Sequence, residues 1–222
     1  MDDIQPQGDA APEPAAARAY RTLERMIVTL ELPPSGTTTE GALIERLGMG
    51  RTPVREAIQR LAWEGLIEVR PRSGLAIAPL RAADWPLVVD ARAGVETVLA
   101  RSAARHCPLH AARRLGAAAD AMQAAVDERD VLAFLEADKL LDEMVADAAD
   151  NAFAVRVAAP LQTHSRRFWY RCQRDDEGLA SSAAHHVRLI GAILDRDEDQ
   201  AATEAGRLMG MLRAIAEESA RR

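Results

Sequence analysis

Cysteine, aromatic residues and long apolar runs are scarce in this chain of 222 residues, and each scarcity excludes a class of protein. The two cysteines, Cys107 and Cys172, are too few for a disulfide framework and form no metal-binding pair. Aromatic residues make up 4% and apolar residues 48%, a balance typical of soluble, Ala- and Leu-rich helical proteins. No window holds the roughly 18 consecutive apolar residues of a membrane span, and the acidic N-terminus lacks a signal-peptide pattern. The sequence therefore predicts a cytoplasmic protein with no membrane partner.

A strong excess of basic residues is also missing, since the formal net charge is −6. Residues 1–14 contain four acidic residues and no basic one, whereas residues 81–222 contain 19 basic against 23 acidic residues. Residues 15–80 contain nine Arg against seven Glu and are the only basic segment. Charge therefore permits nucleic-acid binding by this segment but does not establish it.

Composition and hydrophobic periodicity divide the chain into four parts: a disordered tail (1–14), a first domain (15–79), a linker (80–83) and a second domain (84–222). In the second domain the pattern predicts only helices, over about 84–106, 108–128, 130–149, 151–173, 180–196 and 198–220. The expected fold is mostly α, with an antiparallel six-helix bundle as its C-terminal domain.

The first domain has the element order helix, helix, short turn, helix and two-stranded hairpin. Its second helix is expected to be capped by Thr39 and to stop at Gly48. Its third helix is expected to have Thr52 as N-cap, with the following proline at the first helical position. The period then changes from helical to two, and a turn over 71–74 separates two short strands. This order predicts a winged helix-turn-helix with a two-stranded wing.

The third helix of this domain has two unlike faces. Its apolar residues recur at i, i+4 and i+7: Val54, Ile58 and Leu61. Three polar residues and the arginine just before them share the opposite face: Arg51, Thr52, Arg55 and Gln59. Such side chains can bond phosphates and base edges in a major groove. A solvated face is the commoner fate of such residues alone, but the turn before the helix and the hairpin after it favour DNA reading.

A resemblance to a known family rests on these residues. The run Arg51–Ile58, followed by Leu61–Ile67 and then by Pro71-Arg72-Ser73-Gly74, resembles the winged-helix signature of GntR-type transcription regulators over residues 18–79. It implies a cytoplasmic regulator that binds double-stranded operator DNA.

The resemblance also implies roles for single residues. Arg51, Thr52 and Arg55 match operator-contacting residues, and Gly74 matches the wing glycine that enters the minor groove. Gly41 stands where family members often have an arginine that holds a phosphate. This departure predicts either weaker affinity or a contact taken over by Arg46 or Arg72.

The second domain resembles the effector domain of the FadR subfamily, also called FCD, and its six helices suggest the VanR-like branch. The resemblance rests on three stretches: Arg92–Glu96, Asp138–Asn151, and His185-His186 with Ala192-Ile193. It implies a bundle interior in which one Asp and three His hold a divalent metal. Because one winged helix has a short reach and such modules use pseudo-twofold operators, we expect a homodimer that forms through the C-terminal domain. In such members the metal and a nearby arginine receive a carboxylate ligand.

The metal positions implied by this resemblance are only partly kept. Asp138 keeps the Asp and His186 keeps one His, but Asp142 replaces a His and no His follows His186. We expect at most a weakly bound divalent metal, held by Asp138, Asp142 and His186 and completed by water or His164, and no other cofactor. Two acids on a solvated helix face are the alternative.

The effector is expected to be a small molecule, in particular an organic acid, bound by five residues: Arg92, Asp138, Asp142, His164 and His186. Arg92 can anchor a carboxylate through its planar guanidinium, and an internal ion pair with Glu96 is the alternative. Without a metal, the two aspartates would repel unless a cationic group lay near them. The aromatic run 168–170, with Arg166 and Arg167 before it, is expected in the core or at an interface.

These observations predict a dimeric, effector-controlled transcription regulator, in particular a repressor. A metal-dependent hydrolase is one alternative, but no nucleophile motif, phosphate loop or cofactor fingerprint accompanies the acidic residues. An architectural DNA-binding protein without an effector is another. It would need no polar cluster inside its second domain.

Overall fold

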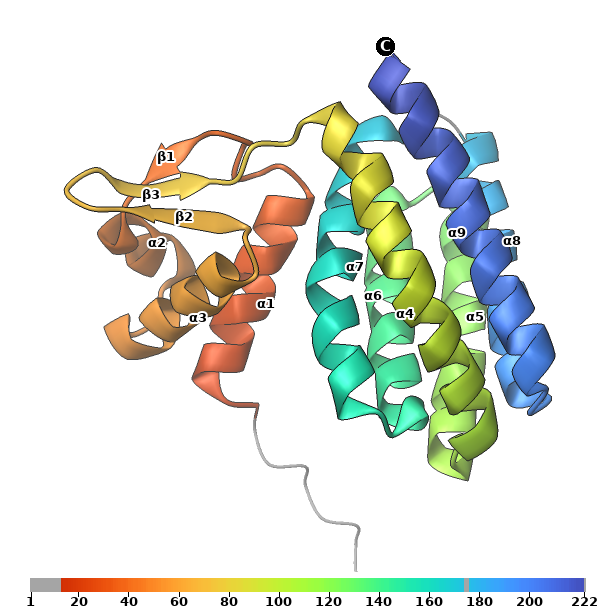
Figure 1. Cartoon of the computed structure of the whole chain (residues 1–222). Coiled ribbons are helices and arrows are strands. Elements are labelled where there is room, and N and C mark those ends of the chain that lie inside the picture. Colours follow the sequence, from red (N-terminus) through yellow and green to blue (C-terminus); the bar gives the residue numbers. More distant parts are fainter. Residues whose placement is uncertain (1–12, 174–175, 222) are drawn as a thin grey trace, which may run out of the picture. The chain divides into compact units, whose positions relative to one another are not determined.

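The computed structural model describes residues 13–173 and 176–221 and divides into two compact units (Figure 1). The N-terminal unit takes in residues 32–78 and those before Val28. The C-terminal unit takes in residues 28–31 and everything from Pro79 on. Residues 1–12 of the predicted disordered tail lie outside the described residues.

The N-terminal unit has the predicted order of elements: α1 (Ala15–Val28), β1 (Thr37–Thr38), α2 (Glu40–Leu47), α3 (Arg51–Trp63), β2 (Ile67–Arg70) and β3 (Gly74–Ile77). The β2–β3 hairpin is antiparallel, with Ile67 opposite Ile77. The sheet has one strand more than predicted, because β1 pairs with the other edge of β3 in the order β1-β3-β2. A strand of two residues is too short to show a period of two, so the sequence pattern missed it.

Helix caps were predicted correctly for α2 and wrongly for α3. The Thr39 side chain accepts a hydrogen bond from the Ala42 N–H, and Gly48 ends the helix at φ +62°. In α3 the N-cap is Gly50, so Thr52 is the second helical residue rather than the cap. Pro53 is tolerated at the third position because the first turn's N–H groups have no intrahelical partner in any case.

The apolar stripe of α3 is buried as expected, with Val54 and Leu61 at 0% exposure. It packs in one core with Leu23 of α1 and Leu43 of α2. At the end of α3, Glu64 accepts a hydrogen bond of 2.8 Å from the Tyr20 hydroxyl of α1. These contacts fix which face of α3 points away from the core.

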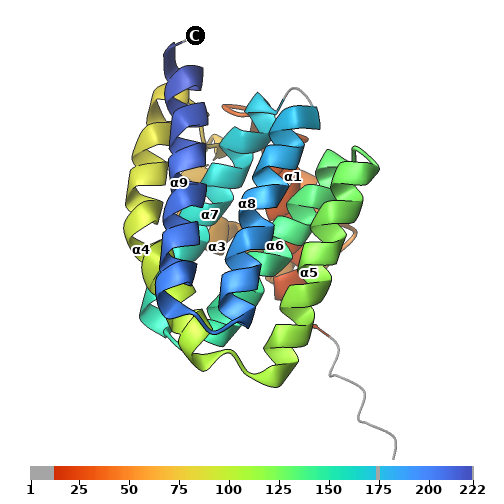
Figure 2. The same cartoon turned by 90° about the vertical axis from the view of Figure 1, so that its right-hand side faces the viewer.

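The described residues of the C-terminal unit form helices and no strands, as predicted: a short 3-10 helix η1 (Ala82–Asp84), α4 (Trp85–His106), α5 (Leu109–Asp127), α6 (Val131–Ala149), α7 (Ala152–Cys172), α8 (Asp176–Leu194) and α9 (Glu198–Arg221). The α-helices form an antiparallel bundle in which α4 and α8 both lie beside α9 (Figure 2). The helix predicted from 180 begins at Asp176, and η1 overlaps the predicted linker. No helix among the described residues has the length and apolarity needed to span a membrane.

The aromatic run on α7 lies in the core of this unit, as predicted. Phe168 stacks on Trp85 with 5.7 Å between ring centroids, and Trp169 contacts Phe134 at 5.0 Å. Arg166 and Arg167, which precede these rings, are also buried. Buried arginines need carboxylate or carbonyl partners, so we expect such partners in the bundle interior.

Candidate functional site

The polar face of α3 is exposed in the N-terminal unit. All four of its predicted DNA-contacting residues point away from the core: Arg51, Thr52, Arg55 and Gln59. The helical period alone gives this division, because the residues of the buried stripe lie on the other side of the helix. Their contacts with DNA remain predictions.

Arg55 is engaged in a contact that the sequence analysis did not foresee. Its guanidinium donates to the Glu40 carboxylate at the start of α2, with Nη2 2.7 Å from Oε1 and Nε 3.2 Å from both oxygens. This hydrogen bond lowers the pKa of Glu40. The carboxylate thus covers the guanidinium edge that would grip guanine or phosphate, and a nucleic acid would have to exchange with it. No sequence signal links residues 15 positions apart on different helices.

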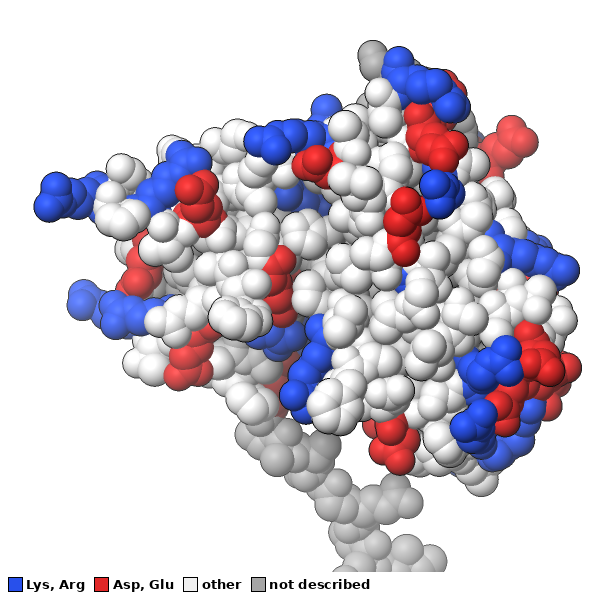
Figure 3. Space-filling view, viewed as in Figure 1, with Lys and Arg blue, Asp and Glu red and all other residues white. Residues whose placement is uncertain are grey.

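The wing carries Arg72 exposed in the turn between β2 and β3, at φ +66°. Figure 3 shows basic side chains at the tip of this hairpin with acidic ones nearby. Gly74 has φ +86°, and a Cβ there would lie 2.6 Å from the Thr38 carbonyl oxygen. The β1–β3 approach therefore requires a glycine at this position, independently of the predicted role in the minor groove.

Four helices of the C-terminal unit bring charged and polar side chains together in the bundle interior. We call this set the interior cluster: Arg92 and Glu96 of α4, Asp138 and Asp142 of α6, Gln162 and Arg166 of α7, and His186 of α8. Four of the five predicted effector-pocket residues therefore lie close together. An unclustered, solvated set would have favoured an architectural protein without an effector. In the structure these four side chains are instead clustered and buried.

The partners of Arg166 were not predicted from the sequence. It was expected with the aromatic run in the core or at an interface, and in the core its Nη1 lies 2.5 Å from Asp142 Oδ2 and 3.5 Å from Asp138 Oδ2. It is the cationic group that two neighbouring buried aspartates need. The spacing of Gln162, Arg166 and Trp169 at i, i+4 and i+7 on one face of α7 was the available signal.

His164 is half-buried and does not line the small void beside Arg92, Asp138 and His186. On a helix, residues two apart point to different faces, so His164 cannot share the face of Arg166. Its part in an effector pocket or a metal site stays a prediction.

Arg92 forms the internal ion pair that was the alternative to ligand binding. Its Nε and Nη2 lie 2.9 and 2.8 Å from Glu96 Oε1, and both side chains are buried. The Gln162 amide donates to the same oxygen at 3.1 Å. Each guanidinium of the interior cluster is thus neutralised by a carboxylate of the chain itself.

The pKa values of the two aspartates shift in opposite directions because their partners differ. Burial, reinforced by the Asp138 charge, raises the pKa of Asp142 to about 7, even though Arg166 acts against it. Burial would also raise the pKa of Asp138, but the hydrogen bond from His186 at 2.8 Å and the nearby arginines hold it below its usual value. Burial disfavours the charged form of His186, but the Asp138 carboxylate raises the pKa of this imidazole.

The residues of the interior cluster do not fit a divalent metal. The guanidinium of Arg166 takes the position between Asp138 and Asp142 that a cation would need, and His186 bonds Asp138 directly. Within residues 13–173 and 176–221, no three His, Cys, Asp or Glu side chains are arranged to hold a metal. The void between them measures about 20 Å³, which is room for one water molecule.

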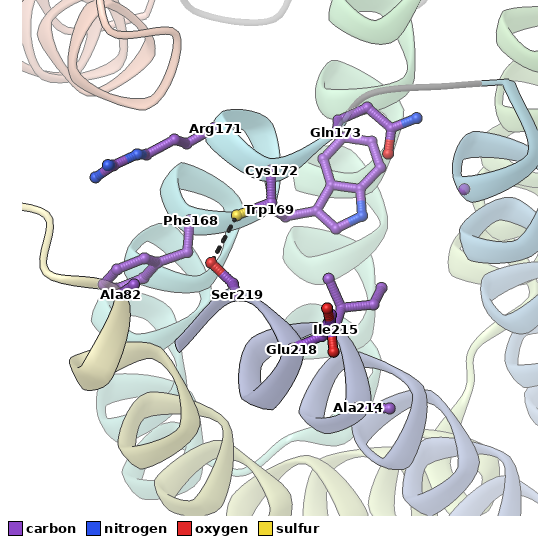
Figure 4. Close-up of a pocket in the computed structure, with 11 residues that line it drawn as sticks. Ala82, Phe168, Trp169, Arg171, Cys172, Gln173, Ala214, Ile215, Glu218 and Ser219 are labelled. Carbon is purple, nitrogen blue, oxygen red and sulfur yellow. Dashed lines mark hydrogen bonds between the residues drawn. The ribbon is translucent and has the colours of Figure 1, made fainter. Parts of the chain in front are cut away.

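A larger cavity of about 640 Å³ lies where α7 and α9 end, beside η1 and the start of α8 (Figure 4). We call it the end cavity. The residues that line it include Phe168, Trp169, Cys172, Ile215, Glu218 and Ser219. Trp169 also lines the small void of the interior cluster, so one indole separates the two spaces.

A winged helix with an exposed polar recognition face, joined to a helical bundle, is the architecture of a DNA-binding transcription regulator. A model described as bacterial regulatory proteins, gntR family, matches residues 15–77, and a model of the FCD domain matches residues 88–210. The chain belongs to the gntR family and carries an FCD domain, as the sequence indicated. Its place in the VanR-like branch stays a prediction.

Individual relatives agree with this assignment. An uncharacterized HTH-type transcriptional regulator in the TAR-I ttuE-ttuC' intergenic region of Agrobacterium vitis is 34% identical over 135 residues, covering 59% of this chain and 79% of that protein. The HTH-type transcriptional repressor RspR of Escherichia coli (strain K12) is 25% identical over 187 residues, covering 84% and 82%. These relatives are transcriptional regulators, which favours a regulator over the hydrolase alternative.

A solved structure shows the same fold. That of E. coli McbR/YncC superposes with a TM-score of 0.79 at 17% sequence identity, covering 93% of this chain and 98% of that one. The order of a winged helix followed by a helical bundle is therefore shared by proteins whose sequences have diverged widely.

Proposed function

We propose that this regulator is a homodimeric repressor whose affinity for its operator is controlled by a small molecule bound in the C-terminal unit. The observation that carries the proposal is the exposed face of α3, which presents Arg51, Thr52, Arg55 and Gln59 on a helix held firmly by its buried stripe. The repressor RspR, which matches over both units, supports the sign of regulation.

The DNA contacts follow from the chemistry of that face. Arg51 and Arg55 bind guanine edges or phosphates, Thr52 bonds a phosphate and Gln59 reaches an adenine edge. Arg72 at the tip of the wing adds a contact beside the minor groove. One winged helix covers a short site, so two copies on successive major grooves would read a near-palindromic operator.

Support for the dimer comes from α4. Four residues of small or apolar type share one exposed face at i, i+4, i+7 and i+11: Leu87, Ala91, Gly94 and Val98. Leu87 exposes 66% and Val98 48% of its surface, which is costly unless another chain covers them. We assign this stripe to contact with a second copy.

Sedimentation of the full chain tests the dimer. Val98→Arg places a charge in the stripe and is expected to yield monomers at concentrations where the unaltered protein is dimeric. Ala121→Arg, on the exposed face of α5, is the matched control and should leave the dimer intact. A dimer that survives Val98→Arg would place the contact elsewhere.

The ion pairs of the interior cluster restrict how an effector could bind there. The predicted organic acid would have to displace Asp142 from Arg166 or Glu96 from Arg92, because both guanidiniums already hold internal carboxylates. A ligand that brings its own carboxylate can make such an exchange, and the organic acid stays a prediction.

Selection of DNA from a fragment library by the full-length protein tests the proposed function. We expect enrichment of one near-palindromic sequence whose half-sites are about 10 base pairs apart, since two recognition helices enter successive turns of the groove. Fragments retained without any common sequence, or no retention at low salt, would contradict the proposal.

A further inference from the structure

We propose that the end cavity is the effector site, and that its ligand is an uncharged, largely apolar or aromatic small molecule bearing a hydroxyl or carbonyl group. This inference rests on the proposed function for the existence of an effector. It places that effector outside the interior cluster, in a space that the sequence analysis did not single out.

Size separates the two spaces. Ligand sites for small molecules measure about 300–1,000 Å³, a range that contains the 640 Å³ of the end cavity. The void of the interior cluster holds about 20 Å³, and enlarging it means breaking the buried contacts of Arg166. A ligand of drug-like or metabolite size therefore fits the end cavity without opening the bundle.

The walls of the end cavity define the chemistry of its occupant. Trp169, Phe168 and Ile215 contribute apolar and aromatic surface, as Figure 4 shows. Among these groups lies one polar pair, in which Cys172 Sγ and Ser219 Oγ are 3.2 Å apart. A hydroxyl can both donate and accept, so this pair can receive one hydroxyl or carbonyl of a ligand.

The charges at the end cavity disfavour an anion. Glu218, which pairs with Arg221 at 2.9 Å, places a carboxylate in the wall, and a carboxylate of a ligand would lie next to it. The guanidinium of Arg171 donates to the Leu80 carbonyl at 2.6 Å, and Figure 4 shows this side chain extending away from Trp169 and Ile215. An uncharged ligand meets neither repulsion nor the cost of leaving water as an ion.

The position of the end cavity suits a regulatory site. Ala82 of η1 lines it, and Arg171 on its wall holds the Leu80 carbonyl. Leu80 and Ala82 both belong to the stretch that follows β3, which ends at Ile77. A ligand here would therefore contact the segment through which the chain enters the C-terminal unit. It would also contact Trp169, which borders the interior cluster.

Binding of N-phenylnaphthylamine, an uncharged aromatic fluorophore, to the full-length protein tests the site. We expect its fluorescence to rise with saturation at one molecule per chain. Ala214→Trp fills the cavity from α9 and should weaken binding at least about tenfold. Ala220→Trp adds the same ring to an exposed position of α9 outside the lining and should leave binding unchanged. Absence of saturable binding, or equal binding by both variants, would overturn the assignment.

Competition against this probe tests the ligand class. Naphthol should displace the fluorophore at least about tenfold more strongly than naphthoate, since the two differ mainly in the charge of the polar group. Stronger displacement by naphthoate would show that the site takes anions and would contradict the proposed class.

A third measurement keeps this inference apart from the proposed function. Saturation with the probe should change affinity for the selected operator in the unaltered protein and in Ala220→Trp, but not in Ala214→Trp. Probe binding at the end cavity with no effect on DNA would refute its role as effector site while leaving operator recognition intact. Failure of DNA selection alone would refute the proposed function and leave the probe result standing.

Discussion

The arginine of the recognition face and the arginine of the interior cluster both pair with a carboxylate, but they differ in burial. The Arg55 side chain is 60% exposed beside Glu40, whereas the Arg166 side chain is 8% exposed beside Asp142. An exposed pair contributes little to stability and exchanges readily, whereas breaking a buried pair leaves a charge without compensation. The same chemistry therefore yields a surface available to DNA in one unit and a fixed internal support in the other.

The largest expected effect comes from Arg166→Ala. Removing the guanidinium leaves two buried aspartates facing each other, so the free energy of unfolding should fall by about 3–5 kcal/mol. Urea denaturation measures the change. Arg113→Ala, at an exposed position of α5, is the control and should have little effect. A loss no larger than the control's would show that Arg166 is not an internal support.

A metal titration tests whether Arg166 occupies the place of a cation between the two aspartates. We expect Zn²⁺, Mn²⁺ and chelators to leave the Tm of the unaltered protein unchanged, because Arg166 already lies between the aspartates. Arg166→His removes that cation and adds a ligand beside Asp138, Asp142 and His186, so Zn²⁺ should raise the Tm of this variant. A full equivalent of zinc retained by the unaltered protein after dialysis against chelator would contradict the assignment.

On the recognition face, Arg55→Ala should lower operator affinity about ten- to a hundredfold with no loss of fold. The side chain lies off the buried stripe, so the Tm should stay the same. Fluorescence anisotropy with the selected operator measures the affinity, and Arg113→Ala again serves as control. Unchanged affinity would show that α3 does not read the DNA through this residue.

The protonation of the interior cluster predicts a pH dependence of stability. Asp142 has a folded pKa near 7 against 3.8 for a free side chain, so its contribution is complete below about pH 4 and is lost as the pH rises through 7. His186, whose pKa is raised above 6.5, also loses its contribution as the pH rises through its folded pKa. The Tm should therefore fall between about pH 5 and 8.

Asp142→Asn tests this dependence because it removes one of the two titrating groups. The fall of Tm with pH should be shallower in this variant, while Asp120→Asn, at an exposed position of α5, should follow the unaltered protein. An unchanged slope in Asp142→Asn would mean that this carboxyl group is ionised throughout the range.

The smallest effect is expected from Glu40→Gln. This change removes the carboxylate that covers the Arg55 guanidinium and deletes a negative charge near the operator, so affinity should rise a few-fold at low salt. Glu45→Gln, at an exposed position of the same helix, is the control and should give a smaller change. An affinity that falls in Glu40→Gln would show that the pair orients Arg55 for DNA instead of competing with it.

Periodicity and turn residues determine much of the local structure of this protein. The stripe of Val54, Ile58 and Leu61 gave the orientation of α3, and Thr39 and Gly48 marked the ends of α2. These features are local, since each depends on residues within a few positions along one helix. For the same reason the helices of the C-terminal unit were predicted with small errors at their ends.

Contacts between distant residues were decided only by the tertiary structure. The third strand pairs Thr38 with Leu75, and the Arg55–Glu40 pair joins two helices. The i, i+4 spacing of Gln162 and Arg166 put these two side chains on one face of α7, but only packing of α7 against α6 placed Arg166 between Asp138 and Asp142. The sequence determined which charges the bundle contains. Their neutralisation by one another, and the closed interior that results, depend on distances that only packing of the helices sets.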